Sequence, residues 1–339
     1  MSFTCHLNKI ISGQNLDQDS MADMLTHIFS GKITEAQIGA FMAGLATKGE
    51  TFEEVAGAAR AMRRKAVRVQ TLAKTVIDIV GTGGDASGSF NISTTTAFVV
   101  AGAGITVAKH GNRSVSSKCG SADVLEALGV NLGADPEIVE EAINEIGIGF
   151  MFAPMYHGSM KYAMKARTDC GIRSIFNMLG PLTNPAAASC QLLGVYAPEL
   201  TEMFAKALKL LGVQKAFVVH GHDGMDEITT TDLTRVTELD DGMIKTYDID
   251  PLNYFDDYSD PKDLLGGDVP YNAKITQAIL KEEQGPRQDV VLLNAGAALV
   301  AADAAPNIEK GIALARTSIE SGKAFEKLEQ LAAYTRENS

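Results

Sequence analysis

A glycine-rich turn follows an apolar run that is typical of a buried strand. Residues 76–80 read VIDIV, and residues 81–94 read GTGGDASGSFNIST. Backbone N–H groups in such a turn can face a phosphate, and the start of a following helix adds the positive end of its dipole. The pattern predicts a phosphate cradle, with an ordinary turn capped by Asn91 or Ser93 as the alternative. The glycine spacing matches neither a Walker A loop nor a dinucleotide fingerprint.

A second polar loop, with the sequence KHGNRSVSSK at residues 109–118, follows a strand-like run at residues 105–108. It gathers cations, hydroxyls and an amide around a single glycine. Such groups can neutralise a polyphosphate, and each charge-assisted hydrogen bond contributes roughly 1.5–3 kcal/mol. The alternative is a merely solvated loop, but an acidic chain has no need of positive charge gathered at one place. The composition therefore favours a phosphate-binding loop.

A third candidate segment, HGHDGMDE at residues 220–227, follows another strand-like run. Adjacent carboxylates such as Asp226 and Glu227 at the carboxyl end of a strand can hold Mg²⁺, which keeps water and phosphate oxygens as its other ligands. Taken alone, the segment also fits an exposed acidic turn. His220 and His222 have no third soft ligand nearby in the sequence, so they make a poor zinc set.

Strand-like and helical stretches alternate from residue 76 onward. The apolar runs of expected strands lie at residues 76–80, 105–108, 150–152, 192–195 and 216–219. Helical patterns lie between them, at residues 93–102, 121–128, 135–146 and 198–211. This alternation predicts an α/β domain with a mainly parallel central sheet flanked by helices. We expect a short antiparallel excursion at residues 232–250 and helical stretches near 272–282, 290–302 and 308–331.

The first seventy residues show helical patterns only. An apolar face at residues 21–29 is followed by two capping-box patterns, Thr34 with Gln37 and Thr51 with Glu54. Three short amphipathic helices need a partner surface, so they pack as a small bundle or form a subunit contact. We therefore expect a small all-helical domain at residues 1–72, joined by a helical segment near 160–190, and a larger α/β domain at residues 73–339.

The overall charge bounds the partners of this 339-residue chain. Its formal net charge of -12 would repel nucleic acid, although a local cation cluster still acts within a Debye length of about 8 Å. The four cysteines are scattered without a CxxC pair, which fits a reducing cytosol. No signal-peptide core and no apolar stretch long enough to span a bilayer is found, so we expect a cytoplasmic protein without a membrane partner.

Four long motifs resemble the anthranilate phosphoribosyltransferase family: GTGGD, KHGNRS with GSADVLEALG behind it, IFNMLGPLTNP at residues 175–185, and HGxxGxDE. The likeness covers nearly the whole chain. It implies a nucleoside phosphorylase/phosphoribosyltransferase-like fold and a homodimer formed through the helical parts. It also implies transfer of the phosphoribosyl group of 5-phosphoribosyl 1-diphosphate to the amine of anthranilate. The products are N-(5-phosphoribosyl)anthranilate and diphosphate, in the second step of tryptophan biosynthesis from chorismate.

The resemblance also implies roles for individual residues. Lys109 and Arg167 are the catalytic residues that it suggests. Anthranilate would meet Gly81, Asn112 and Arg167, while Ser93, Asp226 and Glu227 would hold Mg²⁺, two ions per site, on the donor diphosphate. The donor itself would be bound by Gly81, Gly84, Asp85, Ser89, Asn91, Ile92, Ser93, Thr94, Lys109, His110, Gly111, Asn112, Arg113, Ser114, Val115, Ser116, Ser117 and Ser121.

Two rival functions remain on this scaffold. A pyrimidine-nucleoside phosphorylase would take free phosphate and a nucleoside, and would not need Asp226 and Glu227 for magnesium on a diphosphate. A non-catalytic nucleic-acid-binding relative predicts a basic stripe and broken donor motifs, whereas these motifs are intact and the chain is acidic. No Ser-His-Asp or Cys-His constellation is present, so no residue is assigned as a covalent nucleophile. Cys119 stands where the family pattern leads us to expect serine or another small residue.

Overall fold

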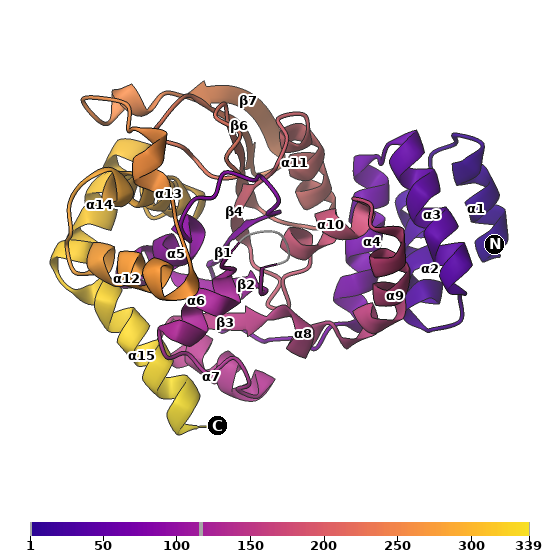
Figure 1. Ribbon diagram of the computed structural model, residues 1–339, viewed down its shortest axis with the longest axis horizontal. Coiled ribbons are helices and arrows are strands. Elements are labelled where there is room, and N and C mark those ends of the chain that lie inside the picture. Colours follow the sequence, from indigo (N-terminus) through magenta and orange to yellow (C-terminus); the bar gives the residue numbers. More distant parts are fainter. Residues whose placement is uncertain (1, 115–117, 339) are drawn as a thin grey trace.

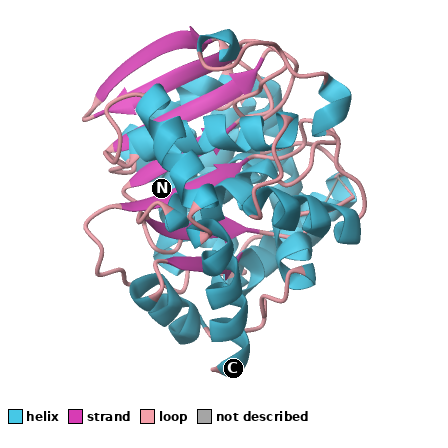
Figure 2. Cartoon of the chain, turned by 90° about the vertical axis from the view of Figure 1, so that its left-hand side faces the viewer, coloured by secondary structure: helices cyan, strands magenta, loops and turns pink. Residues whose placement is uncertain are grey.

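The computed structural model describes residues 2–114 and 118–338. A seven-stranded sheet lies between two groups of helices, and the N-terminal helices form a layer at one end of the molecule (Figure 1). Figure 2 shows the strands stacked from top to bottom with helices around them. The strands are β1 (Val76–Gly81), β2 (Thr106–Gly111), β3 (Ile148–Phe152), β4 (Cys190–Gly194), β5 (Lys215–Gly221), β6 (Thr234–Asp240) and β7 (Met243–Ile249).

The strand order β3-β2-β1-β4-β5-β6-β7 determines where loops can meet. Strands β1 to β5 pair in parallel, whereas β6 and β7 are antiparallel, so the expected α/β class and the antiparallel excursion are confirmed. The carboxyl ends of β1, β2 and β5 therefore lie at one rim of the sheet. The chain passes from β1 to β2 on one side and later returns to β4 on the other. Ligands of open α/β sheets bind at such a switch in strand order.

The N-terminal layer consists of α1 (Phe3–Ile11), α2 (Gln18–Phe29), α3 (Glu35–Lys48) and α4 (Phe52–Lys65). Both predicted capping boxes form, at the starts of α3 and α4. Helix α1 was not expected from the sequence, because its apolar face consists of only a few residues. The residues of that face, Phe3, Leu7 and Ile10, are buried, and α1 packs against α3.

Two helices in the middle of the chain return to this N-terminal layer. They are α9 (Lys161–Cys170), which packs on α2 and α3, and α10 (Ile175–Leu179), which packs on α3 and α4. The short helix α8 (Ala153–Tyr156) before them packs on β3 instead. One hydrophobic core contains buried residues of α1–α4, α9 and α10 and of one face of β4 and β5. Because this core is shared, the boundary near residue 72 stays a prediction.

The remaining helices cover the sheet and hold its loops. They are α5 (Ile92–Gly102), α6 (Ser121–Ala127), α7 (Pro136–Glu145), α11 (Leu200–Leu210), α12 (Val269–Leu280), α13 (Pro286–Ala301), α14 (Ile308–Glu320) and α15 (Lys323–Glu337). Short 3₁₀ turns lie at Gly158–Met160, Gly180–Leu182, Pro251–Asn253 and Pro261–Leu264. The helical stretch expected at 308–331 is two helices, because Gly322 takes a left-handed conformation at a φ of 75° between them. Over the described residues, no helix has the length and apolar character needed to cross a membrane.

Candidate functional site

Two glycines at the switch in strand order make room for Asp226. Gly81 ends β1 and lies in register with Gly194 at the end of β4. A Cβ atom at Gly81 would clash with the Asp226 carboxylate, and one at Gly194 would clash with the Asp226 carbonyl. Any larger residue would therefore displace Asp226 from the crevice between the two strands. The glycine pair places an acid of the third predicted segment directly over the end of the first strand.

The glycine turn is tied to the same acid by hydrogen bonds. The N–H of Gly83 donates to Oδ2 of Asp226 at 2.8 Å, and the N–H of Asp226 donates to the Asp85 carboxylate at 3.4 Å. Gly83 and Gly84 both have positive φ, at 66° and 76°, a conformation that favours glycine. The first and third predicted segments are thus in direct contact.

The carboxylate of Glu227 lies at the N-terminus of α5. The N–H of Ser93, in the first turn of that helix, donates to Oε1 of Glu227 at 3.1 Å. Asn91 stands at the N-cap position but makes no capping hydrogen bond. Its side chain instead donates to the carbonyl of Cys119 and accepts from the Asn272 amide. The alternative of a simple turn capped by Asn91 or Ser93 is therefore wrong, because a distant carboxylate takes the helix N-terminus.

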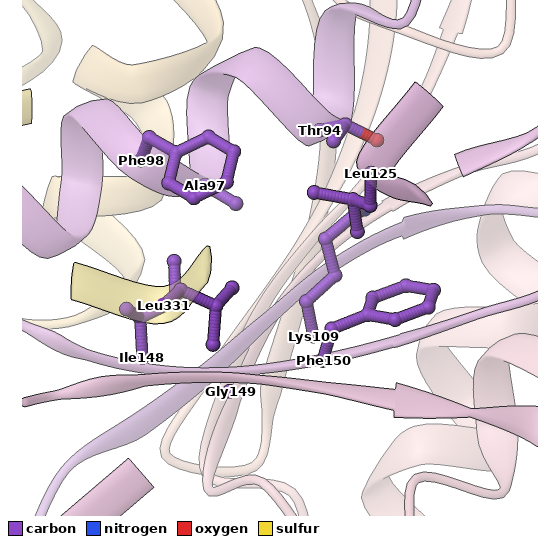
Figure 3. Close-up of a pocket in the computed structure, with 9 residues that line it drawn as sticks. All are labelled: Thr94, Ala97, Phe98, Lys109, Leu125, Ile148, Gly149, Phe150 and Leu331. Atoms are coloured by element: carbon purple, nitrogen blue, oxygen red, sulfur yellow. The ribbon is translucent and has the colours of Figure 1, made fainter. Parts of the chain in front are cut away.

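Lys109 brings the second predicted loop to the same place. Its ammonium donates to the carbonyl of Ile79 at 2.5 Å and to Oγ of Ser93 at 3.4 Å. Its side chain lies beside Leu125 and Phe150 at the wall of a small cavity (Figure 3). This burial lowers the pKa of Lys109, while nearby carboxylates oppose the shift. All three predicted segments therefore converge at one rim of the sheet.

Asp226 and Glu227 are the candidate ligands at this rim for a hard divalent cation. Burial raises the pKa of Asp226, and the charge of Asp85 adds to that rise. Burial also raises the pKa of Glu227, with the Asp226 charge as the second cause. Among the described residues, no group of three or more His, Cys, Asp or Glu side chains is arranged to enclose a metal. Such a cation would take its other ligands from water or a phosphate, as Mg²⁺ commonly does.

The second loop is held by α6. The carbonyl of Asn112 accepts from Oγ of Ser121 at 3.2 Å, and the Asn112 side chain accepts from the N–H of Arg113 at 2.8 Å. The Arg113 guanidinium pairs with Asp123 and Glu126 on α6, at 2.9 and 2.8 Å. These carboxylates raise the pKa of Arg113. This arginine is therefore already paired with acids of its own chain.

The other predicted donor residues take several positions around the rim. Ile92 and Thr94 are buried in the first turn of α5, and Ser89 forms an isolated bridge with Leu265. The N–H of Ser114 donates to the Asp123 carboxylate at 3.1 Å. Gly111 ends β2, where a Cβ would clash with Ser121. The remaining three predicted residues, Val115, Ser116 and Ser117, lie outside the described residues.

Two buried histidines lie where the motif at residues 175–185 meets the second loop. His110 contacts the carbonyl of Gly180 through Nδ1 at 3.2 Å, and its ring meets that of His157 edge to face, with 5.0 Å between the ring centroids. Burial lowers the pKa of His110 to about 3 and that of His157 to about 4. Both rings are therefore neutral near pH 7.

Known proteins of similar sequence and structure share this arrangement of domains. Residues 73–325 match the α/β domain of a glycosyl transferase family, and residues 5–66 match its helical bundle domain. The anthranilate phosphoribosyltransferase of Desulfosudis oleivorans is 64% identical over 337 residues, which are 99% of each chain. That of Syntrophobacter fumaroxidans is 61% identical over 332 residues, 98% of each chain. The chain belongs to the anthranilate phosphoribosyltransferase family.

Solved structures of anthranilate phosphoribosyltransferases have the same fold. The Thermus thermophilus protein superimposes with a TM-score of 0.93 at 41% identity, covering 97% of this chain and 99% of its own. The Saccharomyces cerevisiae enzyme, solved in complex with PRPP and Mg, has a TM-score of 0.90 at 27% identity. That comparison covers 99% of this chain and 98% of the yeast chain. The expected fold, a helical bundle with a mostly parallel α/β domain, is therefore confirmed.

Arg167, expected from the anthranilate phosphoribosyltransferase motifs to meet the acceptor, lies in the last turn of α9. Its guanidinium lies 5.6 Å from the centroid of the Phe176 ring, and burial lowers its pKa. Among the described residues, it makes no hydrogen bond to the three loops. Arg173, a few residues further on, donates to the carbonyl of Gly84 at 3.2 Å. The sequence analysis did not single out this second arginine, because no local pattern shows which loop it reaches.

Asp78 is a second residue that the sequence analysis missed. It is fully buried in β1, accepts from the N–H of His110 at 3.1 Å and from the Asn184 amide at 2.7 Å, and so supports the second loop from below. Asn184 also donates to the carbonyl of Ala108 at 2.8 Å. Burial raises the pKa of Asp78 to about 6. The sequence does contain a sign of this role, because Asp78 is the one charged residue in the apolar run VIDIV, and a buried charge needs hydrogen-bond partners.

Proposed function

We propose that this chain transfers the phosphoribosyl group of 5-phosphoribosyl 1-diphosphate to the amine of anthranilate. The observation that carries the proposal is the convergence of Lys109, Ser93, Asp226 and Glu227 at the switch in strand order. One cation, one hydroxyl and two carboxylates at this point suit a diphosphate held through a divalent cation. The family to which the chain belongs supports the same reaction.

Ser93, Asp226 and Glu227 are proposed to hold Mg²⁺, two ions per site, on the donor diphosphate. The residues fit such ions, because two buried carboxylates with raised pKa values are stabilised in their charged form by a nearby divalent cation. Bound Mg²⁺ would supply charge neutralisation for the diphosphate as it leaves. Lys109, whose ammonium donates to Oγ of Ser93, would add a positive charge at the same place.

The remaining donor contacts are proposed from backbone and polar groups at the same rim. The glycine turn with Gly81, Gly84 and Asp85 would face the diphosphate end. Ser89, Asn91, Ile92 and Thr94 at the start of α5, and the loop of residues 109–117 with Ser121, would surround the rest of the donor. The pairing of Arg113 with Asp123 and Glu126 supports a role in fixing the shape of this loop.

The acceptor is proposed to lie against Gly81, Asn112 and Arg167. A guanidinium binds a carboxylate through two parallel hydrogen bonds, which suits Arg167 to the carboxylate of anthranilate. An aromatic amine is unprotonated near neutral pH, so positioning matters more than a strong general base. No residue is proposed as a covalent nucleophile.

The test of this function is a fluorescence assay of anthranilate consumption, run with and without donor and magnesium. We expect consumption only when both are present. Asp226→Asn combined with Glu227→Gln preserves shape but removes two charges, and should abolish magnesium-dependent donor binding. Asp232→Asn, at an exposed acid of the neighbouring loop, is the matched control and should behave as wild type. Phosphorolysis of a pyrimidine nucleoside without magnesium would instead support the rival phosphorylase function.

We also propose that the enzyme is a homodimer that contacts its partner through the helical layer. Exposed apolar side chains on this layer support the proposal, among them Ile11 on α1 and Met164 on α9. Light scattering should then give a mass of twice 36.0 kDa. A mass of 36.0 kDa at micromolar concentration would contradict it. The net charge of -12 supports small molecules, and not nucleic acid, as its other partners.

A further inference from the structure

Arg173 lies against the glycine turn although it belongs to the segment between α9 and α10. One guanidinium nitrogen donates to the carbonyl of Gly84 at 3.2 Å. The guanidinium carbon lies 3.8 Å from the centroid of the Tyr196 ring, a distance typical of stacking. A planar guanidinium can stack and donate a hydrogen bond at once, which a lysine ammonium cannot do in the same geometry.

The ring beneath Arg173 is itself attached to the turn. The N–H of Tyr196 donates to Oγ1 of Thr82 at 3.1 Å, and the N–H of Thr82 donates to the carbonyl of Gly194 at 2.9 Å. Arg173 therefore contacts the same short turn in two ways. It donates a hydrogen bond to Gly84, and it stacks on Tyr196, whose N–H is bonded to Thr82. A shift of the arginine would move the backbone that is proposed to face the donor diphosphate.

The opposite side of the turn is held by Asp226, which accepts from the N–H of Gly83 at 2.8 Å. The peptide groups of the turn are thus fixed between a proposed metal ligand and Arg173. The two holding contacts act on consecutive residues, Gly83 and Gly84, so a rearrangement at either contact would act on the same short stretch of backbone.

The segment that carries Arg173 also carries the proposed acceptor residue. Arg167 lies in the last turn of α9, which packs on α2 and α3, and Arg173 follows just beyond Gly171, whose φ of 61° turns the chain at the helix end. A contact at Gly84 therefore links the position of this segment to the conformation of the donor turn.

We propose that Arg173 is a positioning residue that couples the acceptor segment to the donor's glycine turn, so that donor and acceptor favour each other's binding. The proposal rests on the proposed function, because it takes the donor to lie at the glycine turn and anthranilate to lie near Arg167. Coupling of this kind is reciprocal, so each substrate should tighten the binding of the other by the same factor.

The test measures anthranilate binding by calorimetry with and without magnesium diphosphate. This ligand carries no phosphoribosyl group, so it cannot react with anthranilate. In the wild type we expect magnesium diphosphate to tighten anthranilate binding by about fivefold or more. In Arg173→Ala we expect this factor to fall to within about twofold of one, while magnesium diphosphate alone binds nearly as in the wild type. Lys161→Ala is the matched control, because Lys161 also lies over a ring in α9 but away from the turn. It should keep the full coupling factor.

A second pair of variants tests the ring side of the same contact. Tyr196→Leu removes the stacking surface and should lose the coupling as Arg173→Ala does, whereas Tyr196→Phe keeps the ring and should retain it. Coupling that survives in both Arg173→Ala and Tyr196→Leu overturns the proposal, as does its absence in the wild type. Loss of magnesium diphosphate binding in Arg173→Ala would also overturn it, since Arg173 would then be a donor ligand. Failure of the wild type to consume anthranilate in the assay above would count against the proposed function instead.

Discussion

The Asp78 carboxylate illustrates how a single residue beneath the site can control it. Its two oxygens accept from the N–H of His110 and the amide of Asn184, and Lys109 is near enough to affect its pKa. Both hydrogen bonds are donated to Asp78, and the two oxygens of the ionised carboxylate accept them. An asparagine side chain at this position has only one oxygen, so it could not accept both. The Asp78 side chain therefore fixes the position of the end of β2 relative to β1.

Asp78→Asn is expected to destabilise the fold and to lower kcat. The new amide would place N–H groups against one of the two donors, and a buried donor left unpaired costs about 1–3 kcal/mol. The shift of His110 would move the adjacent Lys109, so kcat should fall along with stability. Urea unfolding and the anthranilate fluorescence assay measure the two effects. Asp257→Asn, at an exposed position, should change neither, and an Asp78→Asn protein of full stability and activity would contradict this assignment.

Arg167→Ala should act on the acceptor alone. A charge-assisted guanidinium–carboxylate pair contributes roughly 1.5–3 kcal/mol, so the variant should raise the KM for anthranilate by about tenfold or more. The KM for the donor should stay close to its wild-type value. Titration calorimetry with anthranilate checks the affinity directly. Unchanged anthranilate affinity would show that another group binds the carboxylate.

At the scale of elements, a buried ion pair joins two helices of the N-terminal layer to the loop before a third. Glu54 in the first turn of α4 is fully buried, accepts from Lys48 of α3 at 2.8 Å, and accepts from the N–H groups of Leu16 and Thr51 at 2.9 Å. The end of α3, the start of α4 and the loop before α2 thus share one carboxylate. The capping-box pattern predicted part of this contact, but not the bond to Leu16, which lies 38 residues away in sequence.

Glu54→Ala should lower the free energy of unfolding by about 3–5 kcal/mol, because it removes the carboxylate that pairs with the buried Lys48 ammonium. Chemical denaturation followed by circular dichroism measures the loss. Asp169→Ala breaks the exposed Lys165–Asp169 pair of α9 and serves as the control, with an expected change below about 1 kcal/mol. Equal effects of the two variants would mean that Glu54 is not the joint between these helices.

Local signals explain which elements could be predicted from the sequence. The caps at Thr34 and Thr51 and the apolar run of β1 are written in consecutive residues, and each was found. Helices α9 and α10 were expected only as one helical segment near 160–190, because their apolar residues face the N-terminal layer and not a neighbour in sequence. The short helix α8 lies before that segment and was not predicted. The contact of Arg173 with Gly84 spans 89 residues and depends on how α9 returns to the sheet.

At the scale of the whole molecule, the same topology explains why the candidate site was largely predictable. Glycines, cations and acids that follow β1, β2 and β5 meet because parallel strands bring their carboxyl ends to one rim. Arg167 belongs to a helix outside the sheet, so strand order alone does not bring it to this rim. Its role therefore stays a prediction, while the convergence of the three loops follows from the order of the strands.

Burial across the molecule also sets how stability depends on pH. The pKa of His157 is lowered to about 4 by burial, whereas an unfolded histidine has a pKa of about 6.5. The unfolded chain therefore binds more protons between these two values, so stability is fully present above about pH 6.5 and is lost as the pH falls. Asp78, with a raised pKa, works in the opposite direction, so its contribution is lost as the pH rises through about 6.

A variant of His157 isolates the histidine contribution from the opposing contribution of Asp78. Between about pH 7 and pH 5, His157 alone should remove about 2 kcal/mol of stability, because only the unfolded form gains its proton over that interval. His157→Gln has no such group, so its loss of stability on acidification should be smaller than that of the wild type by about 2 kcal/mol. Urea unfolding at the two pH values measures the difference, with His27→Gln at an exposed position of α2 as the control. Parallel pH dependence of His157→Gln and the wild type would mean that the His157 ring takes up its proton within the folded protein.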